Sequence, residues 1–167
     1  MATDAPQRHY RAPCPSCGAP VEFLSASAPY AVCAYCRSTV VRSGDQLKRL
    51  GRMAELFDDH SPLQLMASGR ITLDRREQPF TLVGRLQYKS DAGVWSEWVA
   101  ALDDGRTATL GEDNGSYVFT QADGGTLAPP QWAKPEVGST INVAGQSWVV
   151  AFSGAAQLIA AEGELPK

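Results

Sequence analysis

The sequence predicts a mainly β protein with three parts: an N-terminal four-cysteine ribbon, a short linker helix, and a C-terminal antiparallel domain of the β-sandwich or barrel-like kind. Three observations predict this order. Four cysteines lie in two close pairs near the start, a short apolar pattern of helical period follows them, and the remaining chain alternates between short apolar segments and turn residues. We expect the ribbon over residues 1–42, the helix over 43–60 and the β-domain over 61–167.

The two cysteine pairs are Cys14-Pro-Ser-Cys17 and Cys33-Ala-Tyr-Cys36, and the chain has no other cysteine. Fifteen residues separate the pairs, a spacing typical of a four-cysteine zinc site. Four thiolates complete a tetrahedron and leave no position open for water or substrate, so we expect a structural zinc ion rather than a catalytic one. A redox motif of the thioredoxin type would instead show one pair beside a βαβ pattern.

Short alternating segments surround the cysteines and predict the strands of a zinc ribbon over residues 21–23, 30–32 and 39–41. Gly18 follows the first pair and can take positive φ. Arg37 stands at the equivalent position after the second pair, so we expect slight backbone strain there. His9 is a possible extra ligand, but the cysteines already fill the tetrahedron, and we interpret it as a solvated side chain.

The segment after the ribbon predicts a helix. Ser43-Gly-Asp-Gln46 resembles a capping box, and apolar residues then recur at spacings of three and four, at Leu47, Leu50, Met53, Ala54 and Phe57. Its basic residues suggest either a surface for nucleic acid or a solvated face of a linker helix, and the solvated face is favoured because so few charges are involved.

The last hundred residues predict a series of short antiparallel strands with a turn signal about every ten residues. Gly84 falls inside one strand, at an expected bulge or bend. A proline-rich loop, residues 128–135, interrupts this regular spacing of turn signals. The expected strands are 70–73, 80–88, 94–99, 106–110, 116–120, 140–143, 147–152 and 157–161.

No catalytic constellation is present. Both histidines, His9 and His60, precede the β-domain, and neither a phosphate-binding loop nor a dinucleotide motif occurs. The sequence therefore leans against an enzyme and leaves that question open. Trp95 and Trp98 are three residues apart on an expected strand, so they lie on opposite faces. We therefore expect one of them in the core and the other at a surface. The residues we single out as a possible ligand or partner surface are Trp95, Glu97, Trp98, Trp132, Glu162 and Glu164.

Composition and charge describe an ordinary globular protein of net charge −3. Residues 1–60 carry +1 and residues 61–167 carry −4, without the basic excess of a general phosphate binder. No run approaches the roughly 18 apolar residues of a membrane helix, and residues 1–13 lack the apolar segment of a signal peptide. We therefore expect a cytoplasmic protein without a membrane span, in which thiols bind metal rather than form disulfides.

Several motifs resemble a known family. The residues that carry the resemblance are Gly84-Arg85, Trp95-Ser-Glu-Trp98, Leu102-Asp-Asp-Gly105, Glu112-Asp-Asn-Gly115 and Ala161-Glu-Gly-Glu-Leu-Pro166. They are similar to the bacterial domain of unknown function 4178 family, and the cysteine segment is similar to the zinc-ribbon head that many of its members carry. The resemblance implies no activity; it implies only an accessory part in an envelope- or polyamine-related system.

The function we expect is that of a non-enzymatic adaptor, in which a zinc ribbon and a β-domain bind a protein partner of unknown identity. Two alternatives remain. Zinc ribbons often bind nucleic acid, and basic residues lie near this one, although the acidic overall balance disfavours this reading. The other alternative is a β-barrel that binds a small polyamine-like cation through Glu97, Glu162 and Glu164.

Overall fold

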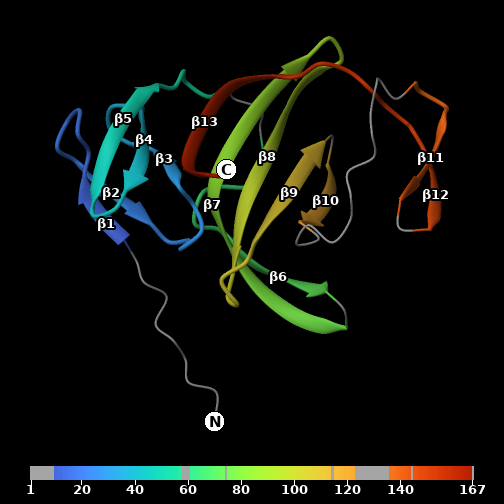
Figure 1. Ribbon diagram of the computed structural model, residues 1–167, viewed down its shortest axis with the longest axis horizontal. Helices are drawn as coiled ribbons and strands as arrows, with labels where there is room; N and C mark the ends of the chain where they lie inside the picture. The colour runs from blue at the N-terminus through green and yellow to red at the C-terminus, as the bar shows by residue number, and fades with distance from the viewer. Residues whose placement is uncertain are drawn as a thin grey trace.

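The computed structural model describes residues 10–57, 61–73, 75–113, 115–122, 136–143 and 145–166. Over these residues the fold is all β, with thirteen strands and no helix, which confirms the mainly β prediction (Figure 1). Every strand pair is antiparallel. Since the described residues form no helix, none of them belongs to a helix that could span a membrane.

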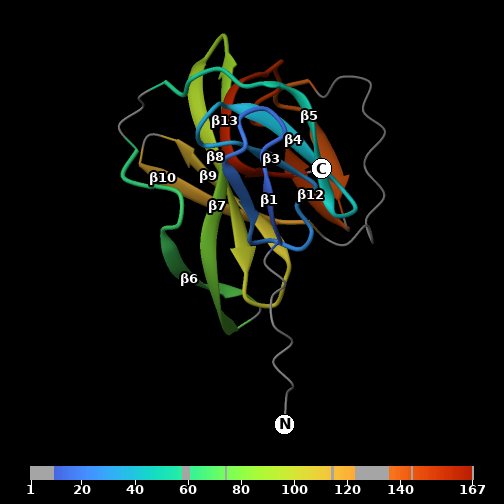
Figure 2. The ribbon, with the colours of Figure 1, turned by 90° about the vertical axis from the view of Figure 1, so that its left-hand side faces the viewer.

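The N-terminal ribbon contains two small antiparallel units. Strands β1 (Tyr10–Pro13) and β2 (Pro20–Phe23) form a hairpin that carries the first cysteine pair in its turn. Strands β3 (Tyr30–Val32), β4 (Ser38–Ser43) and β5 (Gln46–Arg52) follow, with the second pair between β3 and β4. Figure 2 shows these strands in front of the rest of the molecule.

The helix predicted for residues 43–60 is wrong over the described part of that segment. Ser43 and Gln46 face each other across a two-residue turn between β4 and β5, and Gly44 in that turn has φ 60°. Glycine suits this left-handed geometry, so the polar residues taken as a helix cap instead close a hairpin. The helical spacing of the apolar residues is coincidental: Leu47 is buried, but Leu50 is 60% exposed.

Five strands of the C-terminal part follow one another as antiparallel neighbours. They are β6 (Ser68–Leu73), β7 (Arg76–Ser90), β8 (Gly93–Leu102), β9 (Thr107–Asp113) and β10 (Ser116–Gln121). Each overlaps a segment expected from the sequence; β9 begins one residue later than expected, and the other four contain their segments. A separate two-stranded sheet, β11 (Thr140–Val143) with β12 (Gln146–Val149), lies to one side in Figure 1.

The last strand, β13 (Gln157–Leu165), joins the ribbon to the C-terminal strands. One edge of β13 pairs with β7, and residues 163–165 on its other edge pair with β3. The nine-stranded sheet therefore runs β10-β9-β8-β7-β13-β3-β4-β5, with β6 beside the first half of β7. The ribbon is thus part of the same hydrogen-bonded sheet as the C-terminal strands.

Two glycines allow β7 and β13 to approach closely. Gly84 and Gly163 are direct partners in the register of these strands. A Cβ atom at Gly84 would lie 1.7 Å from the carbonyl oxygen of Glu164, and Gly163 has φ 68°. Gly84 also adjoins a register shift between β7 and β8, which confirms the predicted bulge.

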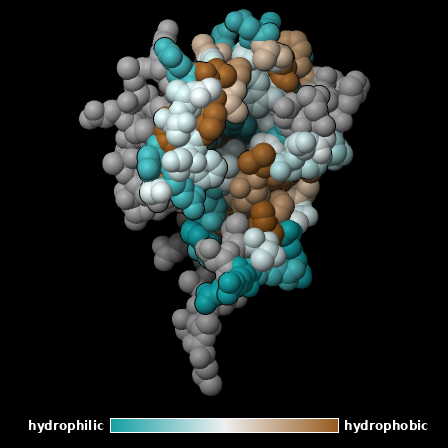
Figure 3. Space-filling view, turned by 90° about the vertical axis from the view of Figure 1, so that its right-hand side faces the viewer, coloured by the Kyte–Doolittle hydropathy of each residue, from teal (hydrophilic) through white to brown (hydrophobic). Residues whose placement is uncertain are grey.

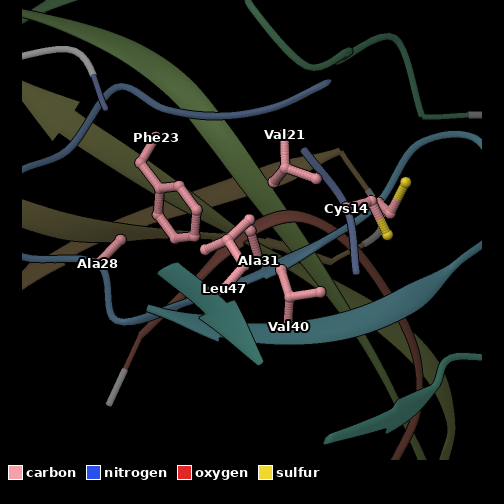
Figure 4. Packing of buried hydrophobic residues seen from close by; sticks show 8 residues of the cluster. Cys14, Val21, Phe23, Ala28, Ala31, Val40 and Leu47 are labelled. Atoms are coloured by element: carbon pink, nitrogen blue, oxygen red, sulfur yellow. The ribbon is translucent and has the colours of Figure 1, made fainter. Parts of the chain in front are cut away.

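Three apolar clusters fill the fold. The ribbon cluster packs the sulfur-bearing Cys14 and Cys33 with Phe23, Val40 and Leu47 (Figure 4). A middle cluster combines Val32 from the ribbon with residues of β7, β8 and β13, and a third lies under β7, β8 and β9. The middle cluster adds apolar contact to the hydrogen bonds that join the ribbon to the remaining sheet.

Candidate metal centre and neighbouring residues

The four cysteine sulfur atoms lie close together, between the β1–β2 turn and the β3–β4 turn. The Sγ atoms of Cys14 and Cys36 are 3.7 Å apart, as are those of Cys17 and Cys33, and all four lie within 4.8 Å of one another. No disulfide joins them. Among the described residues this is the one group of at least three His, Cys, Asp or Glu side chains placed to hold a metal ion.

Matching hydrogen bonds shape the two turns. The N–H of Gly18 donates to the carbonyl of Cys14, and the N–H of Arg37 donates to the carbonyl of Cys33, both at 2.9 Å. The N–H of Ser16 also points at a sulfur, 3.4 Å from Cys14 Sγ. Backbone N–H groups that face a thiolate stabilise its negative charge, so both turns are arranged for sulfur ligands.

The second turn carries the strain that the sequence predicts. Arg37 has φ 57°, close to the 77° of Gly18, and a side chain in this region costs about 1 kcal/mol or more. Its guanidinium is held beyond the turn, 3.7 Å from the Glu55 carboxylate. An arginine therefore occupies a glycine conformation next to Cys36.

Serine hydrogen bonding favours the thiolate form of one ligand. The side chain and backbone of Ser38 lower the pKa of the Cys36 thiol to about 6. Ser38 is buried, and its Oγ lies 3.3 Å from Cys36 Sγ. Because a thiol must lose its proton to bind a metal, this contact prepares Cys36 as a ligand. The pKa of Cys17 is instead raised to about 12, because the backbone hydrogen bond from Ala19 that lowers it is outweighed by contacts with the other cysteines and by burial.

The structure places the two strand tryptophans differently. Trp98 is fully buried, and Trp95 is half-buried and stacks on Tyr88 with ring centroids 5.6 Å apart. Trp95 Nε1 is 3.4 Å from Glu97, which gives that carboxylate a local partner. Trp132 lies outside the described residues, as do His9 and His60.

The two carboxylates of β13 also have different surroundings. Glu164 is buried and accepts hydrogen bonds from the N–H groups of Leu24 and Ser25 in the loop after β2. Glu162 is half-buried, and burial raises the pKa of its carboxyl although the nearby Arg85 and Arg37 lower it. Both residues line a cavity of ≈ 580 Å³ between the ribbon and β13, whereas Glu97 does not line it.

A largely buried polar group on β7, β8 and β9 has contacts that the sequence analysis did not predict. Arg85 donates two hydrogen bonds to Ser96 Oγ, at 3.1 and 2.9 Å, and lies over the Trp98 ring. Glu112 accepts from Trp98 Nε1 at 3.2 Å and from Ser61 Oγ at 2.6 Å. Arg85, Ser96, Trp98 and Glu112 lie in the motifs that carry the family resemblance. Those motifs were the signal by which the sequence could have identified them.

Two of the basic residues near the ribbon contact other side chains, and the others are exposed. Arg42 lies over the Tyr10 ring at 4.2 Å, and Arg37 pairs with Glu55. Lys48 and Arg49 are exposed on β5, which ends the sheet. Exposed lysine and arginine on an edge strand are a common protection against unwanted strand pairing, so this feature needs no nucleic acid to explain it.

Comparison with known proteins gives a match to a family model. A family model described as a domain of unknown function (DUF4178) matches residues 71–167, which is more than half of the chain. The matched region runs from inside β6 to the end of the chain and contains the polar group described above, while the cysteine ribbon precedes it. No curated protein and no solved structure matches the sequence.

Proposed function

The chain belongs to the DUF4178 family, and from that premise we propose that it is a non-enzymatic zinc-ribbon adaptor that binds a protein partner. Two features support a binding role over catalysis. The one metal-type cluster among the described residues has four protein ligands and no open position. The buried Arg85, Ser96 and Trp98 and the half-buried Glu112 are linked by contacts with one another, as residues that stabilise a sheet are.

The metal of this adaptor is zinc. Zinc–sulfur bonds of about 2.3 Å in a tetrahedron place neighbouring sulfurs about 3.8 Å apart. The two sulfur pairs at 3.7 Å fit that spacing, and all four sulfurs lie within 4.8 Å of one another. When bound, the ion supplies folding energy to a ribbon with a small core, and it carries out no reaction.

An exposed apolar surface carries the proposal. Four large apolar side chains of the β11–β12 sheet and its flanks are more than half exposed: Val137, Trp148, Val149 and Phe152. Figure 3 views this side of the molecule and shows groups of hydrophobic residues around a hollow. We call these four residues the hairpin surface, although Trp148 and Val149 are consecutive on β12 and project from opposite faces of the hairpin.

Such a surface is suited to a protein partner. Large apolar groups left in water are unfavourable, and neighbouring ones on a soluble protein mark interaction sites. Tryptophan is also enriched among the residues that contribute most to binding. At 55% exposure, Trp148 has ample area to bury in a complex.

Photo-crosslinking tests the proposal. A benzoylphenylalanine replaces Trp148 in one variant and Leu50 in a control, because Leu50 is comparably exposed, at 60%, on the distant edge strand β5. We expect a discrete adduct with one other protein from position 148 and none from position 50. That protein, once purified, should bind the parent chain and lose at least about tenfold in affinity with Trp148→Ser.

Three results would contradict the adaptor. They are equal adducts from both positions, an adduct only with a second copy of this chain, and unchanged affinity of the purified partner for Trp148→Ser. A Leu50→Ser variant serves as the matched control, because it removes similar apolar area away from the hairpin surface.

A further inference from the structure

The cavity between the ribbon and β13 has the size of a small-molecule site. Its volume of ≈ 580 Å³ lies within the range of about 300–1,000 Å³ that is usual for such pockets. It opens between the second cysteine turn, the β2 strand and the end of the chain, and these segments are held together by the β13–β3 pairing. The cavity is independent of the hairpin surface.

The charged residues that line the cavity are mostly engaged with other groups. Arg11 pairs with Glu22 at 3.3 Å, Arg37 pairs with Glu55, and Glu164 accepts from the backbone of Ser25. The remaining charged lining residue is Glu162, whose carboxylate has no hydrogen bond or ion pair within the described ranges.

Glu162 is also poorly compensated by the nearby cations. Its cross-strand neighbour Arg85 turns its guanidinium to Ser96 and Trp98, and the guanidinium of Arg37 lies toward Glu55. Burial raises the pKa of Glu162 despite these two charges. An additional cation in the cavity would therefore stabilise the ionised carboxylate.

The walls indicate which cation fits. Apolar side chains line the cavity from several segments, among them Leu24, Leu65 and Val83, and Tyr35 lines it as a mostly exposed ring. One available carboxylate beside arginine is too little for a divalent metal, which takes several oxygen ligands. An anion would be repelled by the negative charge of the Glu162 carboxylate. A monovalent cation with an aliphatic part satisfies both the carboxylate and the walls.

We propose that this cavity binds an aliphatic ammonium group, with the Glu162 carboxylate as its ion-pair partner and the apolar walls around its chain. Two sources carry this chemistry, a free alkylamine and a lysine side chain on a peptide. A lysine side chain would reach into the cavity from a peptide bound outside it, whereas a free alkylamine would lie entirely inside the cavity.

Calorimetric titration tests the proposal with n-hexylammonium, with the neutral isostere n-hexanol, and with Nα-acetyl-lysine N-methylamide for the lysine source. The proteins are the parent, Glu162→Gln and the control Glu77→Gln, which removes an exposed carboxylate paired with Arg70 at 3.2 Å on β7, outside the cavity lining. We expect hexylammonium to bind the parent and Glu77→Gln equally, and Glu162→Gln at least about tenfold more weakly, since a charged hydrogen bond is lost.

The outcomes separate cleanly. Stronger binding of the lysine derivative than of hexylammonium identifies a peptide side chain as the source, and the reverse identifies a free amine. Equal binding of hexanol and hexylammonium, unchanged affinity in Glu162→Gln, or no binding of either amine at millimolar concentration overturns the proposal. Chemical-shift mapping on the parent protein provides the second measurement: hexylammonium should perturb Glu162 and Val83 and leave Glu77 unchanged.

Discussion

The carboxylate of Glu164, near the end of the chain, lies 3.0 Å from the backbone nitrogen of Ser25, and the two residues are 139 positions apart. Ser25 belongs to the cysteine ribbon, and Glu164 belongs to the strand that completes the family domain. Both residues are buried. The contact therefore fastens the ribbon to the domain through a charged acceptor that water does not reach.

Replacing this acceptor should destabilise the protein. Glu164→Gln keeps the shape but removes the charge and turns an N–H₂ group toward backbone donors, so we expect a loss of about 1.5–3 kcal/mol in the free energy of unfolding. Denaturant unfolding of the metal-bound protein measures it. A variant as stable as the parent would show that the contact contributes nothing.

Replacing the neighbouring carboxylate, Glu162, should have the opposite effect and stabilise the protein. The folded-state pKa of Glu162 is raised above its ordinary value by burial, so its ionised form disfavours folding above that pKa. We expect Glu162→Gln to raise the melting temperature at neutral pH. The gain should fade as the pH falls through the raised folded pKa toward the ordinary value, below which both states are protonated.

Scanning calorimetry of the parent and Glu162→Gln over that pH range measures the gain. Glu77→Gln, an exposed carboxylate, should show no comparable difference. A Glu162→Gln variant that melts below the parent at neutral pH would be inconsistent with an uncompensated charge.

The glycine pair between β7 and β13 predicts a steric result. Gly84→Ala places a methyl group against the carbonyl of Glu164, and backbone on both strands would have to move. We expect a loss of about 3 kcal/mol or more, or failure to fold. Gly111→Ala on β9 is the control, because its nearest neighbour is an ordinary 3.7 Å away, and it should change stability by less than about 1 kcal/mol.

Removing the metal should affect more than the ribbon. Because β3 pairs with residues 163–165 of β13, chelation should increase amide hydrogen exchange in β3 and in the end of β13. Strands β9 and β10, at the far end of the sheet order, should keep their protection. Loss of protection confined to residues 10–52 would show that the ribbon is an independent module.

Local patterns predicted much of this fold. The cysteine spacing located the four-cysteine cluster, and alternation with turn residues located most strands, because both signals lie within a few residues of sequence. The helix failed for a related reason. Gly44-Asp45 fits a hairpin turn as well as a helix start, and the pairing of β5 with β4 decides between them. A pattern of period 3.6 over the eleven residues from Leu47 to Phe57 cannot outweigh six backbone pairs with a neighbouring strand.

The sequence patterns did not predict the long-range contacts. Glu162 and Glu164 look equivalent as neighbours on one strand, yet Gly163 with its positive φ breaks the regular alternation between them. Both residues line the same cavity, but Glu164 accepts hydrogen bonds from the backbone of the ribbon, whereas Glu162 has no such bond among the described residues. Likewise, the spacing of the two strand tryptophans predicted that one would be buried but could not say which. Trp98 is the buried one because Arg85 and Glu112 cover its ring and its N–H.

Native mass spectrometry of protein purified under reducing conditions tests the central claim most directly. The account predicts one zinc ion per chain and loss of the folded charge-state distribution when zinc is stripped. A folded chain of metal-free mass, or one lighter by the four hydrogens of two disulfides, would contradict it.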